Sequence, residues 1–272
     1  GGGCVTLNFV DMFTAADGTP SDYRKWLSDH GHDGTVYNNP FTGKDPRLYE
    51  TVLIAGDRYR TRCAETWIDG LEHGSSANPK CATGFIIRKF LWDYNDEFLN
   101  KATNSAYIRL SELYLMYAEA LNEIGRSQEA LSWLNKTRTR VGLPEMTLPN
   151  AAKLHSGQAL PDYPECSLKG DKYLREEILD ERAREFCFEE VRWFDIAFWK
   201  REDLMRKILY GIQITRKSGS FEEGNLVLTY SDPSKMDQGR IWQDKFSPKW
   251  FLSAFPSDEF NKGYGLVQNP GW

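Results

Sequence analysis

The chain has 272 residues and a formal net charge of −5 at pH 7. A protein that binds nucleic acid or anionic membranes needs a basic surface, so this charge balance argues against both classes. Hydrophobic residues make up 40% and charged residues 27% of the chain, which is typical of a folded globular protein. No apolar run reaches the ~18 residues of a membrane span. The aromatic share of 14% is high, and Trp and Tyr supply stacking surfaces as well as core packing.

Residues 1–105 form the first of three segments and contain few helix signals. Clusters of Gly, Pro, Asn and Asp mark turns throughout the segment. Between the turns, residues 51–54 and 84–90 are short β-branched or aromatic runs of the kind that pair as strands. Aromatic side chains lie among these turns without helical spacing, which favours a binding surface made of loops.

Residues 106–144, the second segment, have helical periodicity. Apolar residues recur every three or four positions through residues 107–124, and Gly125 ends this helix. Ser127 is a suitable N-cap for a second helix that ends before Gly142. Two helices joined by a short turn resemble one tetratricopeptide unit, and such arrays need about three units. We therefore expect this lone unit to leave an apolar face uncovered. The residues expected on that face are Leu110, Tyr114, Tyr117 and Leu121.

Residues 145–170 contain three prolines and are predicted as a loop. The third segment, residues 171–272, begins with a long helix after Asp171. Its apolar positions recur at helical spacing as far as Trp193, which predicts one continuous helix.

A β-hairpin is predicted after the long helix, with residues 212–215 and 226–230 as its strands, and the tail that follows is irregular. The sequence thus predicts a mostly α-helical fold. It combines a tetratricopeptide-like helical hairpin and a long helix with irregular loops and short β-hairpins.

One stripe of the predicted long helix contains Glu181, Glu185, Glu189 and Arg192. Their spacing of four, four and three residues places them within about 80° of one another. Two carboxylates one turn apart have the separation that glycoside hydrolases use. However, neighbouring arginines lie near enough to lower the carboxylate pKa, and this removes the general acid. We interpret the stripe as a structural row of ion pairs in which Arg192 neutralises Glu185 and Glu189, and we predict no enzyme activity.

Metal and cofactor motifs do not occur in the sequence. The five cysteines include no C-x-x-C pair, so we predict no metal site of the zinc type. Cys63 and Cys81 are near enough in sequence to close a short loop, and the sequence leaves that pairing open. His30 and His32 lack the spacing of a calcium loop, which favours a solvated loop. No dinucleotide fingerprint is present, and we predict no cofactor.

Seven motifs in order along the chain resemble the C-terminal part of the SusD/RagB family of nutrient-binding outer-membrane lipoproteins. They are Gly1-Gly2-Gly3 with Phe9 to Phe13, Asp45-Pro46-Arg47-Leu48, Thr83-Gly84-Phe85 with Arg88-Lys89-Phe90, Ile108 to Ala120, Asn135 to Gly142, Ile178 to Trp199, and Gln268-Asn269-Pro270-Gly271-Trp272. Each motif is short, but together they extend over nearly the whole chain, residues 1–272.

The resemblance implies a SusD-like, tetratricopeptide-containing lipoprotein on the outward-facing surface of a bacterial outer membrane. The N-terminal half and its lipid-anchor cysteine would lie outside this chain, so Cys4 is not expected to be the anchor. The implied function is to bind an oligo- or polysaccharide and deliver it to a SusC-like TonB-dependent transporter. The resemblance also implies no catalysis. An alternative hypothesis is a helical-repeat scaffold that binds a protein or peptide and no carbohydrate.

Sugar recognition needs exposed aromatic faces beside planar polar groups, because the C–H face of a pyranose is apolar. Aromatic residues on the predicted helices are better explained as core, which leaves the loop-rich first segment. The candidate ligand-binding residues are Tyr37, Tyr59, Trp67 and Trp26, with Arg62 and Asp69 as partners for sugar hydroxyls. The competing interpretation of each aromatic residue is that it anchors its own loop.

Overall fold

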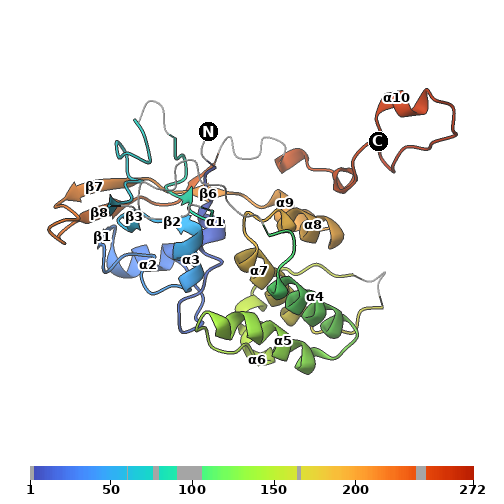
Figure 1. Cartoon of the computed structure of the whole chain (residues 1–272), viewed down its shortest axis with the longest axis horizontal. Coiled ribbons are helices and arrows are strands. Elements are labelled where there is room, and N and C mark those ends of the chain that lie inside the picture. Colours follow the sequence, from blue (N-terminus) through green and yellow to red (C-terminus); the bar gives the residue numbers. More distant parts are fainter. Residues whose placement is uncertain (1–2, 60, 76–79, 91–105, 164–166, 237–242) are drawn as a thin grey trace.

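A computed structural model describes residues 3–59, 61–75, 80–90, 106–163, 167–236 and 243–272. Figure 1 shows two lobes, of which the first combines helices α1–α3 with the strands and the second consists of helices α4–α9. The C-terminal residues, with α10, extend away from the second lobe as a tail. Residues 91–105, the end of the predicted loop-rich segment, lie outside the described ranges.

The helices and strands have the following bounds. The helices are α1 (Leu7–Val10), α2 (Tyr23–His30), α3 (Pro46–Thr51), α4 (Leu110–Glu123), α5 (Ser127–Arg140), α6 (Leu148–His155), α7 (Lys172–Glu185), α8 (Val191–Phe198), α9 (Glu202–Arg206), α10 (Ser257–Phe260), and the 3₁₀ turns η2 (Gln243–Lys245) and η3 (Pro248–Phe251). The strands are β1 (Asp33–Thr35), β2 (Val52–Leu53), β3 (Arg58–Tyr59), β4 (Arg62–Cys63), β5 (Ile86–Ile87), β6 (Tyr210–Gly211), β7 (Ile214–Ser218), β8 (Val227–Tyr230) and β9 (Ser234–Lys235).

The first lobe is built from strands that lie far apart in the sequence. β8 pairs antiparallel with both β1 and β7, and two-stranded ladders join β2 to β5, β3 to β4 and β6 to β9. Residues 52–53 of the first predicted run pair with residues 86–87 of the second. The predicted hairpin also forms, but its first strand is Ile214–Ser218 in place of residues 212–215, and it pairs with Val227–Tyr230. A buried apolar cluster lies between these strands and helices α1–α3.

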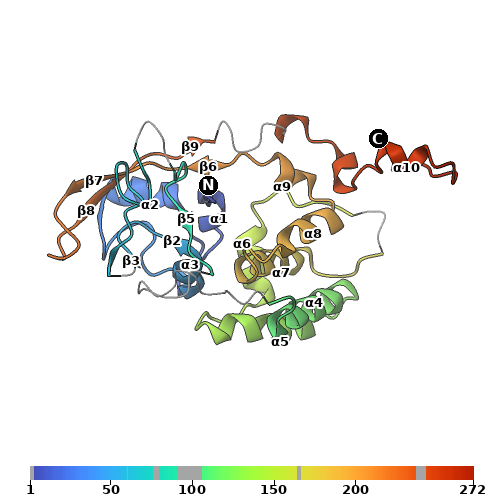
Figure 2. The ribbon, with the colours of Figure 1, turned by 45° about the horizontal axis from the view of Figure 1, so that its top comes forward.

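The second lobe is organised around the predicted helical hairpin. α4 and α5 run antiparallel on either side of Gly125, whose φ of +88° allows the tight reversal. Ser127 is the first residue of α5 and not its cap, since its hydroxyl donates to the side chain of Asn122 at 2.8 Å. A second apolar cluster joins α4, α5, α6 and α7. In the turned view of Figure 2, these helices lie beside the first lobe and do not cover its sheet.

The uncovered face expected on this hairpin is present but shifted. Leu110 and Tyr117 are exposed, Tyr114 is half-buried, and Leu121 is buried in the apolar cluster of the lobe. The exposed stripe therefore lies to one side of the face that the spacing predicted.

Residues 145–170 were predicted as a loop, and this prediction is wrong for α6. The hydroxyl of Thr147 accepts a hydrogen bond from the backbone N–H of Asn150 at 3.3 Å and caps the helix. Pro149 lies in the first turn, where a missing N–H costs no helical hydrogen bond. Pro149, which we interpreted as a sign of a loop, is thus compatible with the first turn of a helix.

The prediction of a single long helix is also wrong, because this segment forms two helices, α7 and α8. The backbone has positive φ at Phe188 (61°) and Glu190 (66°), which a continuous right-handed helix does not allow. α7 therefore ends at Glu185, and α8 starts again at Val191 in a new direction.

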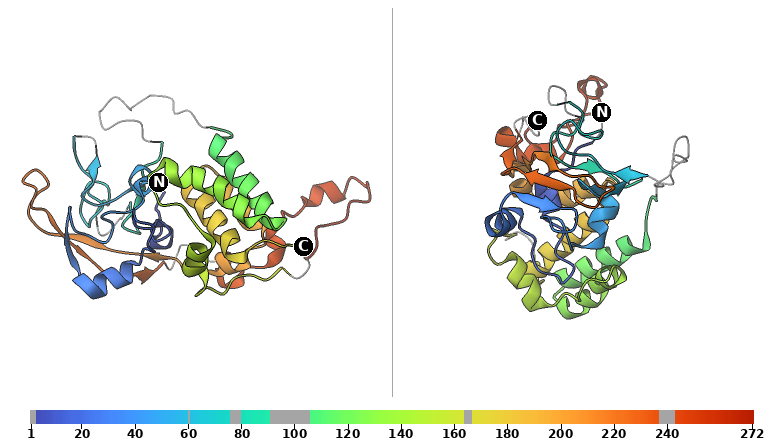
Figure 3. Two further views of the ribbon diagram at one scale, coloured as in Figure 1. Left: turned by 90° about the horizontal axis from the view of Figure 1, so that it is seen from below. Right: turned by 90° about the vertical axis from the view of Figure 1, so that its left-hand side faces the viewer.

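The tail is held by its own hydrogen bonds. The backbone N–H of Phe255 donates to the side chain of Gln268 at 2.9 Å, and the indole N–H of Trp272 donates to the carbonyl of Lys249 at 3.0 Å. Figure 3 shows this self-folded segment projecting from the second lobe.

The N-terminal cap of α7 is open to a simple test. The carboxylate of Asp171 accepts hydrogen bonds from the backbone N–H groups of Tyr173 (2.9 Å) and Leu174 (2.8 Å). We expect Asp171→Ala to lower the free energy of unfolding by about 1 kcal/mol, and Asp171→Asn, which keeps an acceptor, to lower it much less. Urea denaturation measures both. Equal losses in the two variants would contradict a capping role.

Candidate functional site

Helix α7 buries charge along most of its length. Seven of its 14 residues are both charged and buried, namely Arg175, Glu176, Glu177, Glu181, Arg182, Arg184 and Glu185. Their partners come from elements all around the helix: α3, α4 and α8 each contribute an oppositely charged side chain, and α5 contributes both Arg138 and Arg140. Removing an unpaired ion from water costs several kcal/mol, so these pairings constrain where each element lies.

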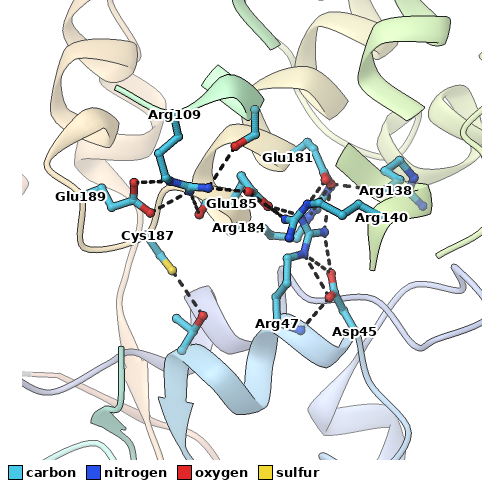
Figure 4. Close-up of polar contacts among 12 residues, drawn as sticks. Asp45, Arg47, Arg109, Arg138, Arg140, Glu181, Arg184, Glu185, Cys187 and Glu189 are labelled. Atoms are coloured by element: carbon cyan, nitrogen blue, oxygen red, sulfur yellow. Dashed lines mark hydrogen bonds and ion pairs between the residues drawn. The ribbon is translucent and has the colours of Figure 1, made fainter. Parts of the chain in front are cut away.

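Glu181 and Glu185 share cations from both lobes, as Figure 4 shows. Arg47 of α3 lies 2.7 Å from Glu181 and 3.1 Å from Glu185. Glu185 also contacts Arg109 at 2.9 Å and Arg140 at 2.7 Å. Arg47, Arg109 and Arg140 are far from these carboxylates in the sequence, whereas Arg184, which contacts Glu181 at 2.9 Å, is one of the neighbouring arginines expected to do so.

Glu189 extends the same network beyond the end of α7. Arg109 contacts it at 2.8 Å while also contacting Glu185, and Lys89 forms a second ion pair with it. The glutamate stripe therefore combines ion pairs between elements with one pair along α7, in which Arg184 lies 2.9 Å from Glu181.

Arg192 does not take part in this network, so its predicted role is wrong. Its guanidinium donates to the carbonyl of Leu179 at 2.9 Å, and its carboxylate contact is Asp180 at 3.8 Å. The positive φ at Glu190 is the physical reason, because the turn carries Arg192 away from the direction that a continuous helix would give it. Glu185 and Glu189 are neutralised by other residues.

The network keeps its carboxylates ionised. Burial would raise the pKa of Glu181, but Arg47 and Arg184 outweigh burial and hold that pKa well below its usual range. The pKa values of Glu185 and Glu189 are lowered in the same way, through Arg109 among others. A general acid must carry a proton near neutral pH, and these groups do not. The arrangement supports structure and offers no acid for bond cleavage.

The Asp45-Pro46-Arg47 sequence explains how the first lobe reaches the network. The carboxylate of Asp45 accepts from the backbone N–H of Arg47 (3.0 Å) and from its guanidinium (2.7 Å), while Pro46 starts α3. Asp45 thereby orients the arginine towards α7. From the other side, Arg184 donates to the carbonyl of Met12 at 3.1 Å. The two lobes are joined by charge as well as by backbone contacts.

A hollow of about 350 Å³ lies over the network. Lys89, Arg109 and Arg140 line it, and each of them already pairs with Glu185 or Glu189. An anion could bind these cations only by displacing the carboxylates, so we interpret the hollow as part of the ion-pair network and not as an anion-binding site.

The aromatic candidates lie at three separate places. Tyr37 is 76% exposed, and its hydroxyl lies near Gly224 in the turn between β7 and β8. Tyr59 packs under the guanidinium of Arg62 at 5.4 Å. Trp26 is half-buried and stacks on His30 with 4.8 Å between ring centroids. Of these rings, Tyr37 offers the most open face.

Trp67 is only 6% exposed and belongs to the core of the first lobe, so it presents no ring face to a ligand. The expectation that it stacks on sugar is corrected by this burial. Arg62 forms an ion pair with Glu72 and donates to the carbonyl of Cys63 at 2.8 Å, so its guanidinium is already oriented. Asp69 is exposed on a left-handed turn (φ 66°).

Both loop histidines interact with backbone carbonyls. His32 Nδ1 lies 2.7 Å from the carbonyl of Tyr230, and His30 Nδ1 lies 3.1 Å from that of Trp26. Within the described ranges, no group of three or more His, Cys, Asp or Glu side chains is placed to hold a metal ion. In the same part of the chain, no helix is long and apolar enough to cross a membrane.

Comparison with known proteins decides the family. The sequence profile of the SusD family matches residues 1–272. The chain belongs to the SusD family. Two curated relatives, both SusD-like proteins of Formosa agariphila, are 40% identical over 96 residues and 30% identical over 98 residues. Each match covers 35% of this chain and 17% of the relative. The resemblance predicted from the seven motifs is confirmed.

Solved structures agree on the SusD fold. A SusD-like protein of Bacteroides fragilis superposes with a TM-score of 0.69 at 25% identity, covering 98% of this chain and 46% of the other. A SusD superfamily protein of Bacteroides vulgatus has a TM-score of 0.54 at 15% identity, covering 98% and 44%. The mostly helical fold with few short strands is thus confirmed, and the chain spans less than half the length of these solved relatives.

The corrected network predicts an order of stability losses. We expect Arg47→Ala to lower the free energy of unfolding by about 3–5 kcal/mol, because it leaves Glu181 and Glu185 short of a buried cation. Arg192→Ala should cost about 1 kcal/mol, since its carboxylate contact is long and partly exposed. Arg126→Ala, which breaks an exposed pair with Glu129, is the control and should cost the least of the three. Denaturant unfolding ranks the three, and a larger loss for Arg192→Ala than for Arg47→Ala would refute the assignment.

Two acidic residues outside the network predict an effect of pH on stability. Burial raises the pKa of Asp11 from 3.8 to about 7; the nearby Asp22 raises this pKa further, while Lys44 partly lowers it. Burial also raises the pKa of Asp57 to about 6. A carboxyl group whose pKa is raised in the folded state contributes its full stabilisation below pH ~4, the pKa of the unfolded state. This contribution is lost as the pH rises through the pKa of the folded state. The network glutamates act in the opposite direction and lose stability only as pH falls below their ordinary value of 4.5.

We therefore expect maximal stability near pH 5 and a fall towards pH 7.5. Asp11→Asn should remove about 2 kcal/mol of this fall, because its amide does not titrate. Urea midpoints measured every half pH unit test the expectation. A wild-type protein that becomes more stable from pH 5 to 7.5, or an Asp11→Asn profile identical to that of the wild type, would disprove it.

Proposed function

We propose that this chain is part of a cell-surface glycan-binding protein of a nutrient uptake complex. Membership of the SusD family over the whole chain is the observation that carries the proposal. The chemistry of the glutamate network supports a binding role over catalysis, because its carboxylates are ionised and paired. The protein would bind an oligo- or polysaccharide and release it unchanged.

The proposed partners follow from the same family. Ligand would pass to a SusC-like TonB-dependent transporter in the outer membrane, and the protein would be held at the outward-facing surface by a lipid anchor outside residues 1–272. This arrangement needs neither a cofactor nor a metal ion from the chain.

Within the described residues, the first lobe offers the surface best suited to a sugar. Tyr37 presents an open ring beside the β7–β8 turn, where Asn225 and Glu223 supply polar groups. Tyr59 is a second ring at a separate place in this lobe, and the planar guanidinium of Arg62 over it is held by Glu72. A ring face combined with oriented planar polar groups matches the two sides of a pyranose. Trp26, Arg62 and Asp69 remain secondary candidates.

A second candidate function is a scaffold that binds a protein or peptide. The specific observation that favours it is the exposed apolar stripe of α4, which includes Leu110, Leu113 and Tyr117. Proteins use contiguous apolar surface for protein contacts, whereas sugar sites combine aromatic rings with polar groups.

Tyr37 provides the sharpest test of sugar binding. We expect Tyr37→Ala to weaken binding to the best ligand on a glycan array by at least about tenfold, which matches the loss of one stacked aromatic ring (~1.4 kcal/mol). The melting temperature should be unchanged because the side chain is exposed. Tyr264→Ala is the matched control, since Tyr264 is 71% exposed on the tail. Isothermal titration calorimetry measures the affinities.

Two outcomes would count against this proposal. Binding by Tyr37→Ala at wild-type affinity would place the sugar elsewhere. A protein that binds no glycan on the array but captures helical peptides would favour the scaffold. Trp67→Ala does not test the site, because truncating a buried Trp costs about 3–5 kcal/mol of stability by itself.

A further inference from the structure

A short stretch at the start of the chain runs beside β5. The backbone N–H of Val5 donates to the carbonyl of Phe85 at 3.1 Å, and Cys4 pairs antiparallel with Ile86. β5 also pairs with β2, so Ile86 has a backbone neighbour on both sides. The position of Cys4 is therefore fixed by the ladder of the first lobe.

A bend just before β5 carries Cys81 back to the same place. The chain reverses over residues 82–84, and Gly84 has a φ of +83°, which residues with a side chain rarely adopt. Cys81 is thereby folded over the start of β5. The thiol of Cys4 lies 3.5 Å from the carbonyl oxygen of Lys80, the residue directly before Cys81.

This contact makes Cys4 and Cys81 neighbours in space. The bonds from the Lys80 carbonyl oxygen to the Cα of Cys81 extend over at most about 4 Å, so Sγ of Cys4 lies within roughly 7.5 Å of that Cα. Disulfides join Cα atoms that are about 4.4–6.8 Å apart. The separation is within the range that side-chain rotation can close.

Electrostatics point to the same proximity. Burial raises the pKa of the Cys81 thiol to about 12, and the charge of Cys4 is the next cause of this rise. One thiolate disfavours ionisation of another only as a near neighbour.

The other described cysteines have different surroundings. Burial raises the pKa of Cys63 to about 11, and the charges that raise it further are those of Glu65 and Glu222. Cys187 lies between α7 and α8 in the second lobe. The pairing of Cys63 with Cys81 that the sequence left open thus has no supporting contact among the described residues, whereas Cys81 has a different cysteine beside it.

We infer that Cys4 and Cys81 are a disulfide site, in which rotation of the two side chains joins their sulfurs without displacing either backbone segment. The bond would close the loop of residues 5–80 and fix the start of the chain to the segment that leads into β5. The same segment continues to Lys89, which pairs with Glu189 of the second lobe. The strand between the lobes would then be held at both ends.

The bond forms by thiol–disulfide exchange and needs a second disulfide, such as oxidised glutathione, as the oxidant. Cys4 is half-buried and Cys81 is buried, so the Cys4 thiolate attacks first and one half of the oxidant leaves as a thiolate. The Cys81 thiolate then attacks Sγ of Cys4 and displaces the other half. Two protons leave the protein thiols, and two electrons pass to the oxidant, which ends as two thiols.

In a cell, this bond requires an oxidising compartment, because the cytosol keeps thiols reduced. That requirement rests on the proposed function, which places the chain at the outward-facing surface. The test uses the purified chain and no glycan, so its failure and the failure of the proposed function are separate results.

Peptide mapping tests the site directly. Residues 1–272 are reduced, oxidised with glutathione disulfide at about pH 8.5, where more thiol is ionised, blocked with iodoacetamide and digested with trypsin without reduction. Cleavage after Arg24, Lys80 and Arg88 releases residues 1–24 and 81–88. We expect these two peptides to be joined in the main cross-linked product, which is lighter than their sum by two hydrogen atoms.

Thermal unfolding measures the consequence. Closing a loop of this length should raise the melting temperature of the oxidised protein by at least about 5 °C over that of the reduced protein. Cys4→Ser, at a half-buried position, should remove both the cross-link and the shift, whereas the matched control Cys63→Ser should keep both.

Three results would overturn the inference. The first is a main cross-link that joins Cys81 to Cys63 or to Cys166, which lies outside the described residues. The second is oxidation that yields only glutathione adducts or no cross-link. The third is an equal rise in melting temperature in Cys4→Ser and the wild type.

Discussion

The structure depends on the buried charges of α7. A helix that takes seven ionised side chains out of water is stable only where each one meets an opposite charge, and here those charges arrive from elements before and after it in the chain. Arg47 of the first lobe, Arg138 of α5 and Asp195 of α8 are each held at hydrogen-bonding distance. Ion pairs are directional, so they select one arrangement of these elements more sharply than apolar contact would.

Two apolar cores are thereby joined across a polar boundary. The cluster of the first lobe and that of the helical lobe are separate, and Arg47, Glu181, Glu185 and Arg109 connect the elements between them. Such a boundary adds little net stability over an apolar one but penalises any displacement that leaves a charge unpaired. The same boundary holds the carboxylates ionised, which is why a stripe with the spacing of a catalytic pair serves here as a joint.

The local elements of the fold were predictable, and their tertiary roles were not. The α4–α5 hairpin and the β7–β8 hairpin follow from periodicity and turn residues, which act over a few neighbours. α7 is charged on every side, and this pattern is also that of a solvated helix, so its burial had no local signal. Arg192 was misassigned because left-handed Glu190 is not readable from its sequence. Trp67 was misassigned because burial of a turn aromatic depends on distant strands.

The second lobe buries charge and exposes apolar side chains. Its centre is the charged α7, while its outer helices α4 and α8 expose leucine, tyrosine and phenylalanine. A lobe that ended at its own surface would be more stable with these positions exchanged, since exposed apolar area and buried charge both cost free energy. The ion pairs of α7 offset the second of these costs, whereas the apolar positions of α4 and α8 have no cover among the described residues.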